Sequence, residues 1–110
     1  MAFALANFAP IGNSSKPLSG VGTATIKGAP SIFSYATADT KATADTAGYF
    51  NGGVAYGGAY NLVNVGDMIY ALTGAGSGGT LAASLLIVNS KSGGVLDVND
   101  GTAITMTDTD

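Results

Sequence analysis

The chain has 110 residues, a formal net charge of −3 and 10% charged residues, against 46% hydrophobic residues. Its charged side chains are four Lys and seven Asp, and it has no His, Cys, Trp, Arg, Glu or Gln. Because His is the usual general base near neutral pH, and because His and Cys are the main ligands of transition metals, this composition argues against an enzyme, a metal site or a cofactor. We expect one domain that acts as a structural or interaction protein.

Nucleic-acid binding and membrane insertion are also disfavoured. The four Lys residues are scattered, whereas proteins that bind nucleic acids cluster their basic side chains against phosphates. The longest apolar run, Leu81–Val88, is much shorter than the roughly 20 residues of a membrane span. The apolar start, Met1–Phe8, lacks the basic residues of a signal peptide. We therefore expect neither a nucleic acid nor a membrane as a partner.

The first 30 residues differ from the rest of the chain. They contain all three prolines and few β-branched residues, which predicts an extended N-terminal arm over residues 1–30, ahead of a compact β domain over residues 31–110. The apolar side chains of this arm need burial, either on their own domain or on a neighbouring subunit, and both alternatives stay open. As candidate contacts to a partner we select Phe3, Leu5, Phe8 and Ile11.

The remainder of the chain alternates short β-like segments with glycine-rich turns. Strands at this spacing, without a convincing helix, favour an all-β fold, namely a small antiparallel β-sandwich or barrel. The expected strands are Thr23–Lys27, Ser31–Thr37, Val54–Tyr56, Asp67–Thr73, Leu81–Val88, Val95–Val98 and Thr102–Thr107.

Two of these segments carry more specific predictions. In Asp67–Thr73 the side chains alternate between two faces, and Asp67 is expected to open the strand with its carboxylate accepting turn amides. Leu81–Val88 is apolar on both faces, as expected for a central strand, although its Leu-Ala-Ala-Ser-Leu-Leu sequence is compatible with a helix. If the strand is central, Leu85→Asp should unfold the domain by burying an unpaired charge.

Two glycine-containing segments resemble ligand-binding motifs but are better explained as turns. Gly74-x-Gly76-x-x-Gly79 fits a dinucleotide fingerprint, which also requires a following helix within a βαβ unit. Asp97–Gly101 resembles a calcium loop, but it is one residue short and the chain has no Glu for the closing position. Because Asn-Asp-Gly favours positive φ, we expect Asn99–Gly101 to join two strands in a tight hairpin.

Two further features of the sequence are a pentapeptide repeat and a group of tyrosines. Ala36–Thr40 recurs six residues later as Ala42–Thr46, and we interpret the pair as a small, polar, exposed hairpin or loop. The tyrosine group fits either a contact surface for carbohydrate or protein or the edge of an ordinary core, and both interpretations stay open. Its candidate surface residues are Tyr49, Tyr56 and Tyr60.

From about residue 28 onward the chain resembles small virion-surface proteins of tailed bacteriophages, the capsid decoration or cement proteins and related head-fibre proteins. The resemblance lies in the order and style of several short patterns, and in an excess of Ala, Gly and Thr without Cys. The patterns are Tyr35-x-Thr37-x-Asp39, Gly48-Tyr49-Phe50-Asn51, Leu62-x-x-Val65-Gly66-Asp67-x-Ile69, Val95-x-x-Val98 and Ala103-x-Thr105.

This resemblance implies a virion structural protein that decorates and stabilises a capsid by binding coat subunits on its outer surface. The implied partner is the major capsid protein, the implied assembly is a homo-oligomer with a trimer favoured, and residues 1–30 would be the capsid-binding arm. The implied location is the capsid surface, after synthesis in the host cytoplasm. The alternative is a fibre or adhesin module that binds host glycans through its tyrosine-rich surface.

Overall fold

The computed structural model describes residues 3–11, 30–53, 58–76 and 80–105, and within them the chain is mostly β-sheet with little helix. The predicted all-β class is therefore confirmed. The elements in chain order are η1 (Leu5–Asn7), β1 (Phe8–Pro10), β2 (Ile32–Ala36), α1 (Lys41–Ala44), η2 (Tyr49–Asn51), β3 (Met68–Thr73), β4 (Ala82–Ser92), β5 (Val95–Val98) and β6 (Thr102–Ile104).

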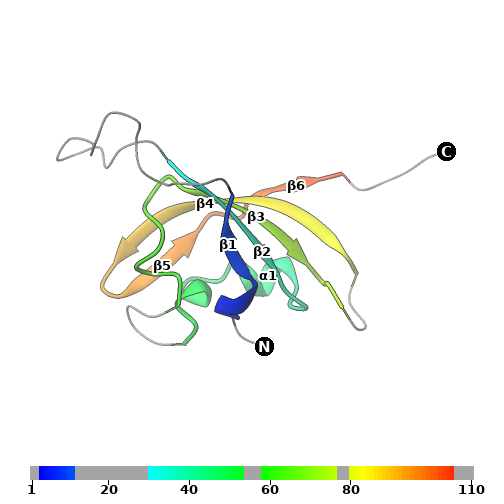
Figure 1. Cartoon of the computed structure of the whole chain (residues 1–110), viewed down its shortest axis with the longest axis horizontal. Helices are drawn as coiled ribbons and strands as arrows, with labels where there is room; N and C mark the ends of the chain where they lie inside the picture. Colours follow the sequence, from blue (N-terminus) through cyan, green and yellow to red (C-terminus); the bar gives the residue numbers. More distant parts are fainter. Residues whose placement is uncertain (1–2, 12–29, 54–57, 77–79, 106–110) are drawn as a thin grey trace.

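The strands form one sheet in the order β1-β2-β3-β4-β5, and β6 also pairs with β4 (Figure 1). The β2–β3 pair is parallel, whereas the other described pairings are antiparallel, as the sequence predicted. A parallel pair needs a long crossover, and here the crossover carries α1 and η2 beneath the sheet. The prediction of a wholly antiparallel sheet misses this pair, because the sequence pattern predicts only strands and turns over residues 37–66, without a helical crossover.

Strand β4 is the central strand of the sheet and pairs with three other strands. One edge pairs with β3, while the other edge pairs with β6 over Ala83–Leu85 and with β5 over Val88–Ser92. The expected central strand is therefore correct, and the helical alternative for this segment is wrong. Strands β5 and β6 lie one after the other along the same edge, so Asn99–Gly101 is a turn between them and the hairpin predicted there is wrong.

The tight hairpin lies instead between β4 and β5, at Gly93 and Gly94. Ser92 pairs with Val95, which leaves a two-residue loop, and both glycines have positive φ of 62° and 79°. Positive φ at both central positions is the requirement of a type I′ turn, which matches the twist of the two flanking strands. The signal was present in the sequence as a Gly-Gly pair between β-forming residues.

Alternate residues of each central strand face a single buried core. The alternation expected in β3 is confirmed, since Ile69 and Ala71 are fully buried and Met68, Tyr70 and Leu72 are half-buried on the other side. The core cluster contains Phe33, Tyr35, Phe50, Ala59, Tyr60, Val63, Ile69, Ala71, Leu86, Val88, Leu96 and Val98.

The expectation for Leu85 needs a correction. The fully buried leucine of β4 is Leu86, whereas Leu85 is half-buried and faces away from the core. The sequence identified the strand but not its inward face, because both leucines sit in a run that is apolar on both sides. The unfolding substitution should therefore be made at Leu86.

The N-terminal segment folds onto the sheet. Strand β1 pairs with β2, and Phe3 and Phe8 pack against the core cluster, with the Phe3 ring stacked 5.0 Å from the ring of Tyr35. Of the two alternatives for the apolar residues of the arm, Phe3 and Phe8 follow the first and pack on their own domain. Residues 12–29, including the expected strand Thr23–Lys27, lie outside the described residues, as do residues 54–57 with the expected strand Val54–Tyr56.

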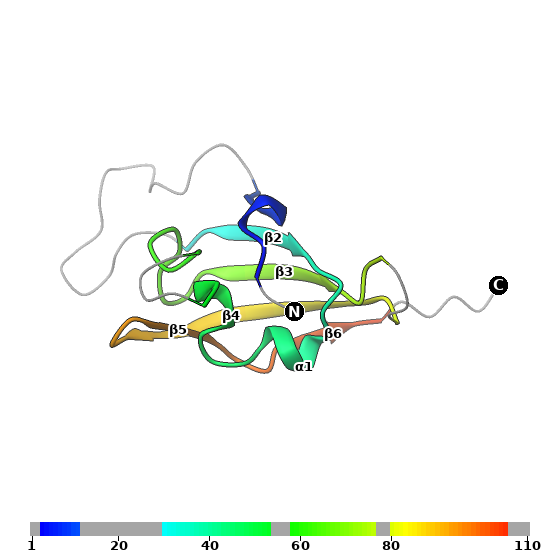
Figure 2. The same ribbon diagram turned by 90° about the horizontal axis from the view of Figure 1, so that it is seen from below.

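The covered face of the sheet is the one that carries this core. Viewed from below, α1 and the N-terminal segment lie in front of the strands (Figure 2). The loop with Ala59, Tyr60 and Val63 contributes to the same core. The described helices therefore lie on one side of the sheet.

Candidate interaction surfaces

A polar network centred on Tyr49 holds the covering layer against the sheet. The Tyr49 hydroxyl donates to Oδ2 of buried Asp39 at 2.7 Å and lies 2.9 Å from the Tyr35 hydroxyl and 3.2 Å from Thr37 Oγ1. The backbone amide of Ala4 donates to the Tyr35 hydroxyl at 3.0 Å. The network therefore joins η1, β2 and η2 through buried and half-buried groups.

This environment raises the pKa of Tyr49 well above its usual range. Burial is the main cause, because it disfavours the phenolate, and the neighbouring Tyr35 hydroxyl and Asp39 carboxylate act in the same direction. The Tyr49 hydroxyl therefore remains a hydrogen-bond donor at physiological pH. Its chemistry here is structural, since its proton is shared with a carboxylate that lies in the same packed cluster.

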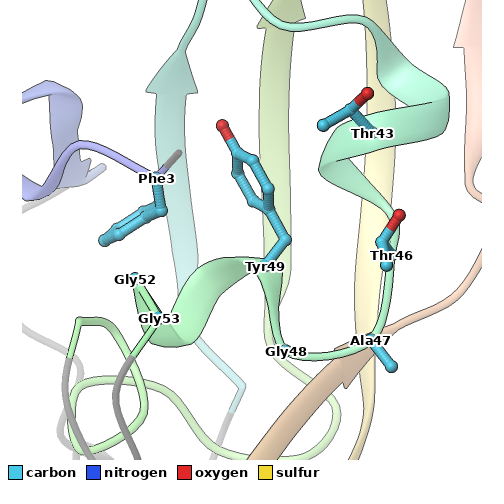
Figure 3. Close-up of a pocket in the computed structure, with 8 residues that line it drawn as sticks. All are labelled: Phe3, Thr43, Thr46, Ala47, Gly48, Tyr49, Gly52 and Gly53. Carbon is cyan, nitrogen blue, oxygen red and sulfur yellow. The ribbon is translucent and has the colours of Figure 1, made fainter. Parts of the chain in front are cut away.

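An open groove lies beside Tyr49 (Figure 3), with a volume of about 320 Å³. The aromatic rings of Phe3 and Tyr49 lie on one side of it, and α1 and the turn after it lie on the other. The groove carries no described charge. Its lining residues are Phe3, Thr43, Thr46, Ala47, Gly48, Tyr49, Gly52 and Gly53.

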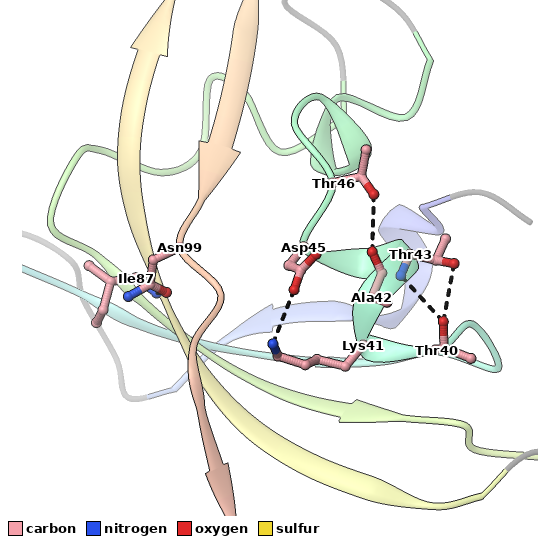
Figure 4. A network of polar contacts seen from close by, with 8 residues as sticks. All are labelled: Thr40, Lys41, Ala42, Thr43, Asp45, Thr46, Ile87 and Asn99. Atoms are coloured by element: carbon pink, nitrogen blue, oxygen red, sulfur yellow. Dashed lines mark hydrogen bonds and ion pairs between the residues drawn. The ribbon is translucent and has the colours of Figure 1, made fainter.

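The two copies of the pentapeptide repeat have different structures. In the first copy Thr37 and Asp39 are buried at the end of β2, while the second copy forms most of α1 and its C-terminal turn. Thr40 caps α1 by accepting from the Thr43 amide at 3.3 Å (Figure 4). The predicted polar, exposed hairpin or loop is therefore wrong for both copies, because the first buries Thr37 and Asp39 and the second follows an N-cap and enters a helical turn.

Other contacts in Figure 4 are also local. Thr46 Oγ1 donates to the Ala42 carbonyl at 3.1 Å, and Lys41 pairs with Asp45 at 3.1 Å. The Ile87 amide donates to Asn99 Oδ1 at 2.9 Å. These contacts satisfy backbone and charged groups within the chain and leave no activated nucleophile among them.

Asp67 has the role that the sequence predicted. Its Oδ1 accepts from the Ser31 amide at 2.9 Å and its Oδ2 accepts from the Asn64 amide at 2.8 Å. The buried carboxylate therefore ties the start of β2 and the loop before β3 to the start of β3. This is a structural use of a carboxylate, which stabilises a turn rather than activating a substrate.

Asn51 is a structural residue that the sequence interpretation missed. Its buried amide group donates to the Gly94 carbonyl at 2.6 Å and accepts from the Leu96 amide at 2.8 Å. The Gly48 amide donates to the Leu96 carbonyl at 2.9 Å, so η2 covers the outer edge of β5. Covering an edge in this way prevents unwanted strand pairing at that edge.

The candidate contact residues named from the sequence have different surroundings. Tyr60 is buried and its ring lies 4.6 Å below the Lys91 ammonium group, while Tyr49 is half-buried in the network above. Tyr56 lies outside the described residues. The described tyrosines of the predicted surface therefore belong to the core and its edge. Of the four N-terminal candidates, Leu5 is 50% and Ile11 is 52% exposed.

Reactive and metal-binding groups are scarce in the described part of the chain. No group of three or more His, Cys, Asp or Glu side chains in the described ranges is placed to hold a metal ion. Gly74 and Gly76 lie between β3 and antiparallel β4, so the helix required by a dinucleotide fingerprint does not follow them. No helix among the residues described is long and apolar enough to cross a membrane.

Over β2, β3, β6 and the first half of β4, the face of the sheet opposite the core is apolar and is not covered by the described helices (Figure 1). The strand register places side chains of β2, β3, β4 and β6 next to one another on it. Strands β1, β2, β3 and β6, and residues 82–87 of β4, contain no charged residue. We call this surface the open face, and its large side chains are Ile32, Met68, Tyr70, Leu72, Leu85, Ile87 and Ile104.

Comparisons with known protein families, with curated proteins and with solved structures found no match for this chain.

Proposed function

We propose that this chain is a structural protein of a phage particle, which decorates the capsid and stabilises it by binding coat subunits on the outer surface. The resemblance described above suggests the setting. The observation that carries the proposal is the chemistry of the described surface, which exposes large apolar side chains and holds most of its charged groups in local contacts.

The exposed apolar side chains are large and numerous for so small a domain. Eight of them in the described residues are between 40% and 59% exposed, which provides ample contact area for another protein. They are Leu5, Ile11, Ile32, Leu62, Val65, Leu81, Val95 and Ile104.

The charged groups of the described residues, by contrast, are mostly engaged within the chain. Asp39 and Asp67 are buried and hydrogen-bonded, and Lys41 pairs with Asp45. The Lys91 ammonium donates to the Val63 carbonyl at 2.9 Å. A surface with little free charge is weakly solvated, so burial against a large partner has a small desolvation cost.

The N-terminal segment provides the proposed contact with coat subunits. Phe3 and Phe8 anchor this segment to its own core, while Leu5 and Ile11 on the same segment are half-exposed. A partner would therefore meet Leu5 and Ile11 on a pre-ordered support, which lowers the entropy cost of binding. On a capsid lattice such contacts are repeated, and linked copies then bind far more tightly than one contact alone.

The glycan-binding alternative has less support. Its tyrosines would need exposed ring faces, but Tyr60 is buried and the hydroxyl of Tyr49 is engaged with Asp39. The Tyr60 ring is hidden in the core and cannot stack on a sugar ring, whereas the half-buried Tyr49 ring borders the groove described above. The decoration role needs only the exposed aliphatic side chains, which are present.

Quantitative mass spectrometry of purified particles from the source tests the proposal. A ratio of this chain to the major coat subunit near one, or near a simple fraction of it, supports a decoration role. A few copies per particle would instead indicate a fibre or spike, and absence from the particle would contradict the proposal.

Binding of the full chain to bare capsids tests the contact residues. Leu5→Asp and Ile11→Asp should each weaken binding, whereas Leu62→Asp, a control of matched exposure (52%), should not. Equal weakening of capsid binding by all three substitutions would contradict the proposal that the N-terminal segment makes the contact.

A further inference from the structure

The open face has no part in the coat-binding segment proposed above, yet four neighbouring strands contribute apolar side chains to it. Tyr70 of β3 lies at its centre, between Ser34 of β2 and Leu85 of β4 in the strand register. We propose that this face packs against the same face of a second copy of the chain, so that two sheets form a two-layered β-sandwich. This inference concerns the free protein and does not rest on capsid binding.

The absence of charge on the open face favours an identical partner. A two-fold contact brings the same surface of both copies together, so any charged side chain near its centre would oppose its own copy or a like charge. The parts of the strands that form the open face, namely β2, β3, β6 and residues 82–87 of β4, carry neither Lys nor Asp. Two such faces meet without repulsion and without burying an unpaired charge.

The arrangement of strands also fits a second sheet. Sheets that pack face to face lie about 10 Å apart, with the side chains of the two inner faces interdigitating. One face of this sheet is already covered by η2, α1 and the loop with Tyr60, so a second sheet has only the open face available. The outer positions of the open face are its most exposed, with Ile32 at 44% and Ile104 at 40%. The side chains at the centre of the open face are half-buried by their neighbours.

The size of the open face limits the area that this contact can bury. Four neighbouring strands with about five residues each cover a flat area of about 300 Å² per copy. Stable protein complexes bury about 800 Å² per partner, so this contact falls at the weak end of specific interfaces. The predicted dimer therefore dissociates on dilution, with a dissociation constant in the micromolar range or weaker.

Sedimentation equilibrium of the full chain, over roughly micromolar to millimolar concentration, tests the inference. We expect a reversible monomer–dimer equilibrium. Ile32→Lys, on the open face, should raise the dissociation constant at least about tenfold, because the dimer would bury an unpaired ammonium group. Tyr70→Lys should act in the same direction. Leu62→Lys, in the loop after Tyr60 and 52% exposed, is the control and should leave the equilibrium unchanged.

Three outcomes would overturn the inference. They are a monomer over the whole concentration range, a trimer mass at high concentration, or equal weakening by Leu62→Lys and Ile32→Lys. Far-ultraviolet circular dichroism of each variant separates lost association from lost folding. A monomer that still binds capsids would leave the proposed function intact and would show that the open face has a different occupant.

Discussion

The two faces of the sheet are built from alternate residues of the same strands but have different surroundings. On the covered face, Ile69 and Leu86 are fully buried beneath α1, η2 and the loop before β3. On the open face, their sequence neighbours Tyr70 and Leu85 are only half-buried. Both faces are apolar, so the difference lies in what covers them and not in their composition.

This contrast shows where the polar residues of the chain are used. The covering layer is held by Asn51, by the Tyr49–Asp39 pair and by Lys91, each of which bonds to the backbone or to a buried partner. Buried polar groups of this kind specify one arrangement of loops, because leaving any of them unpaired is costly. The described helices and loops leave the open face uncovered, so another molecule can pack on it.

The largest expected difference between the faces is at adjacent leucines of β4. Leu86→Asp should cost more than about 4 kcal/mol and unfold the domain, because it buries an unpaired charge in the core. Leu85→Asp should leave the domain folded, because Leu85 is half-buried on the open face. Urea denaturation of both variants measures this difference. Equal destabilisation would mean that the open face is buried within the monomer.

Removing the Asn51 side chain should be the next largest effect. Asn51→Ala leaves the buried Gly94 carbonyl and Leu96 amide without partners, at a cost of about 2–4 kcal/mol in unfolding free energy. Asn99→Ala is the matched control, because its contact with the Ile87 amide is exposed and should be worth about 1 kcal/mol or less. Denaturant titrations of the two variants should therefore differ, and similar losses would show that η2 does not secure β5.

The Tyr49–Asp39 pair should give a smaller effect with a distinct pH signature. Tyr49→Phe removes the donor to a buried carboxylate, and we expect a loss of about 1–3 kcal/mol near neutral pH. Below pH of about 10 Tyr49 is protonated in both the folded and the unfolded state, so its contribution is constant there. Above that pH the unfolded chain ionises while the folded state, whose Tyr49 pKa is raised, keeps its proton, so stability falls.

Thermal unfolding of wild type and Tyr49→Phe between pH 7 and pH 11 measures this difference. The stability of wild type should fall more steeply with pH than that of the variant. Parallel curves for wild type and Tyr49→Phe would show that burial does not hold the proton on Tyr49.

The smallest effect on folding should be on the open face itself. Ile32→Lys replaces a side chain that is 44% exposed, so the unfolding free energy of the monomer should change by less than about 0.5 kcal/mol. Urea denaturation at low protein concentration measures this. A loss of several kcal/mol would show that Ile32 contributes to the core of the monomer.

The sequence predicted the strands better than the path between them. The alternation in Asp67–Thr73, the central position of Leu81–Val88 and the turn role of Asp67 all follow from local patterns, and the structure confirms them. The parallel β2–β3 pair and the edge-covering role of Asn51 depend on contacts between distant residues. A periodic pattern within one segment carries no information about such contacts.

The candidate surface was less predictable still. In the sequence, Phe3, Leu5, Phe8 and Ile11 are all apolar residues of one arm. Only the structure separates the two that pack inward from the two that are exposed. The repeat shows the same limit, because an identical pentapeptide adopts a strand end and a helical turn in two contexts. The open face emerged only once the register had aligned the outward residues of separate strands.

The most direct test of the open face as a contact surface uses a single cysteine in this chain, which has none of its own. The rate of alkylation of Ser34→Cys, beside Tyr70 on the open face, would be measured against Ser92→Cys, at the exposed end of β4, over a range of protein concentrations. Our account predicts that Ser34→Cys reacts readily in dilute solution and is protected as concentration rises, while Ser92→Cys is unaffected. Protection of Ser34→Cys at every concentration, or at none, would contradict it.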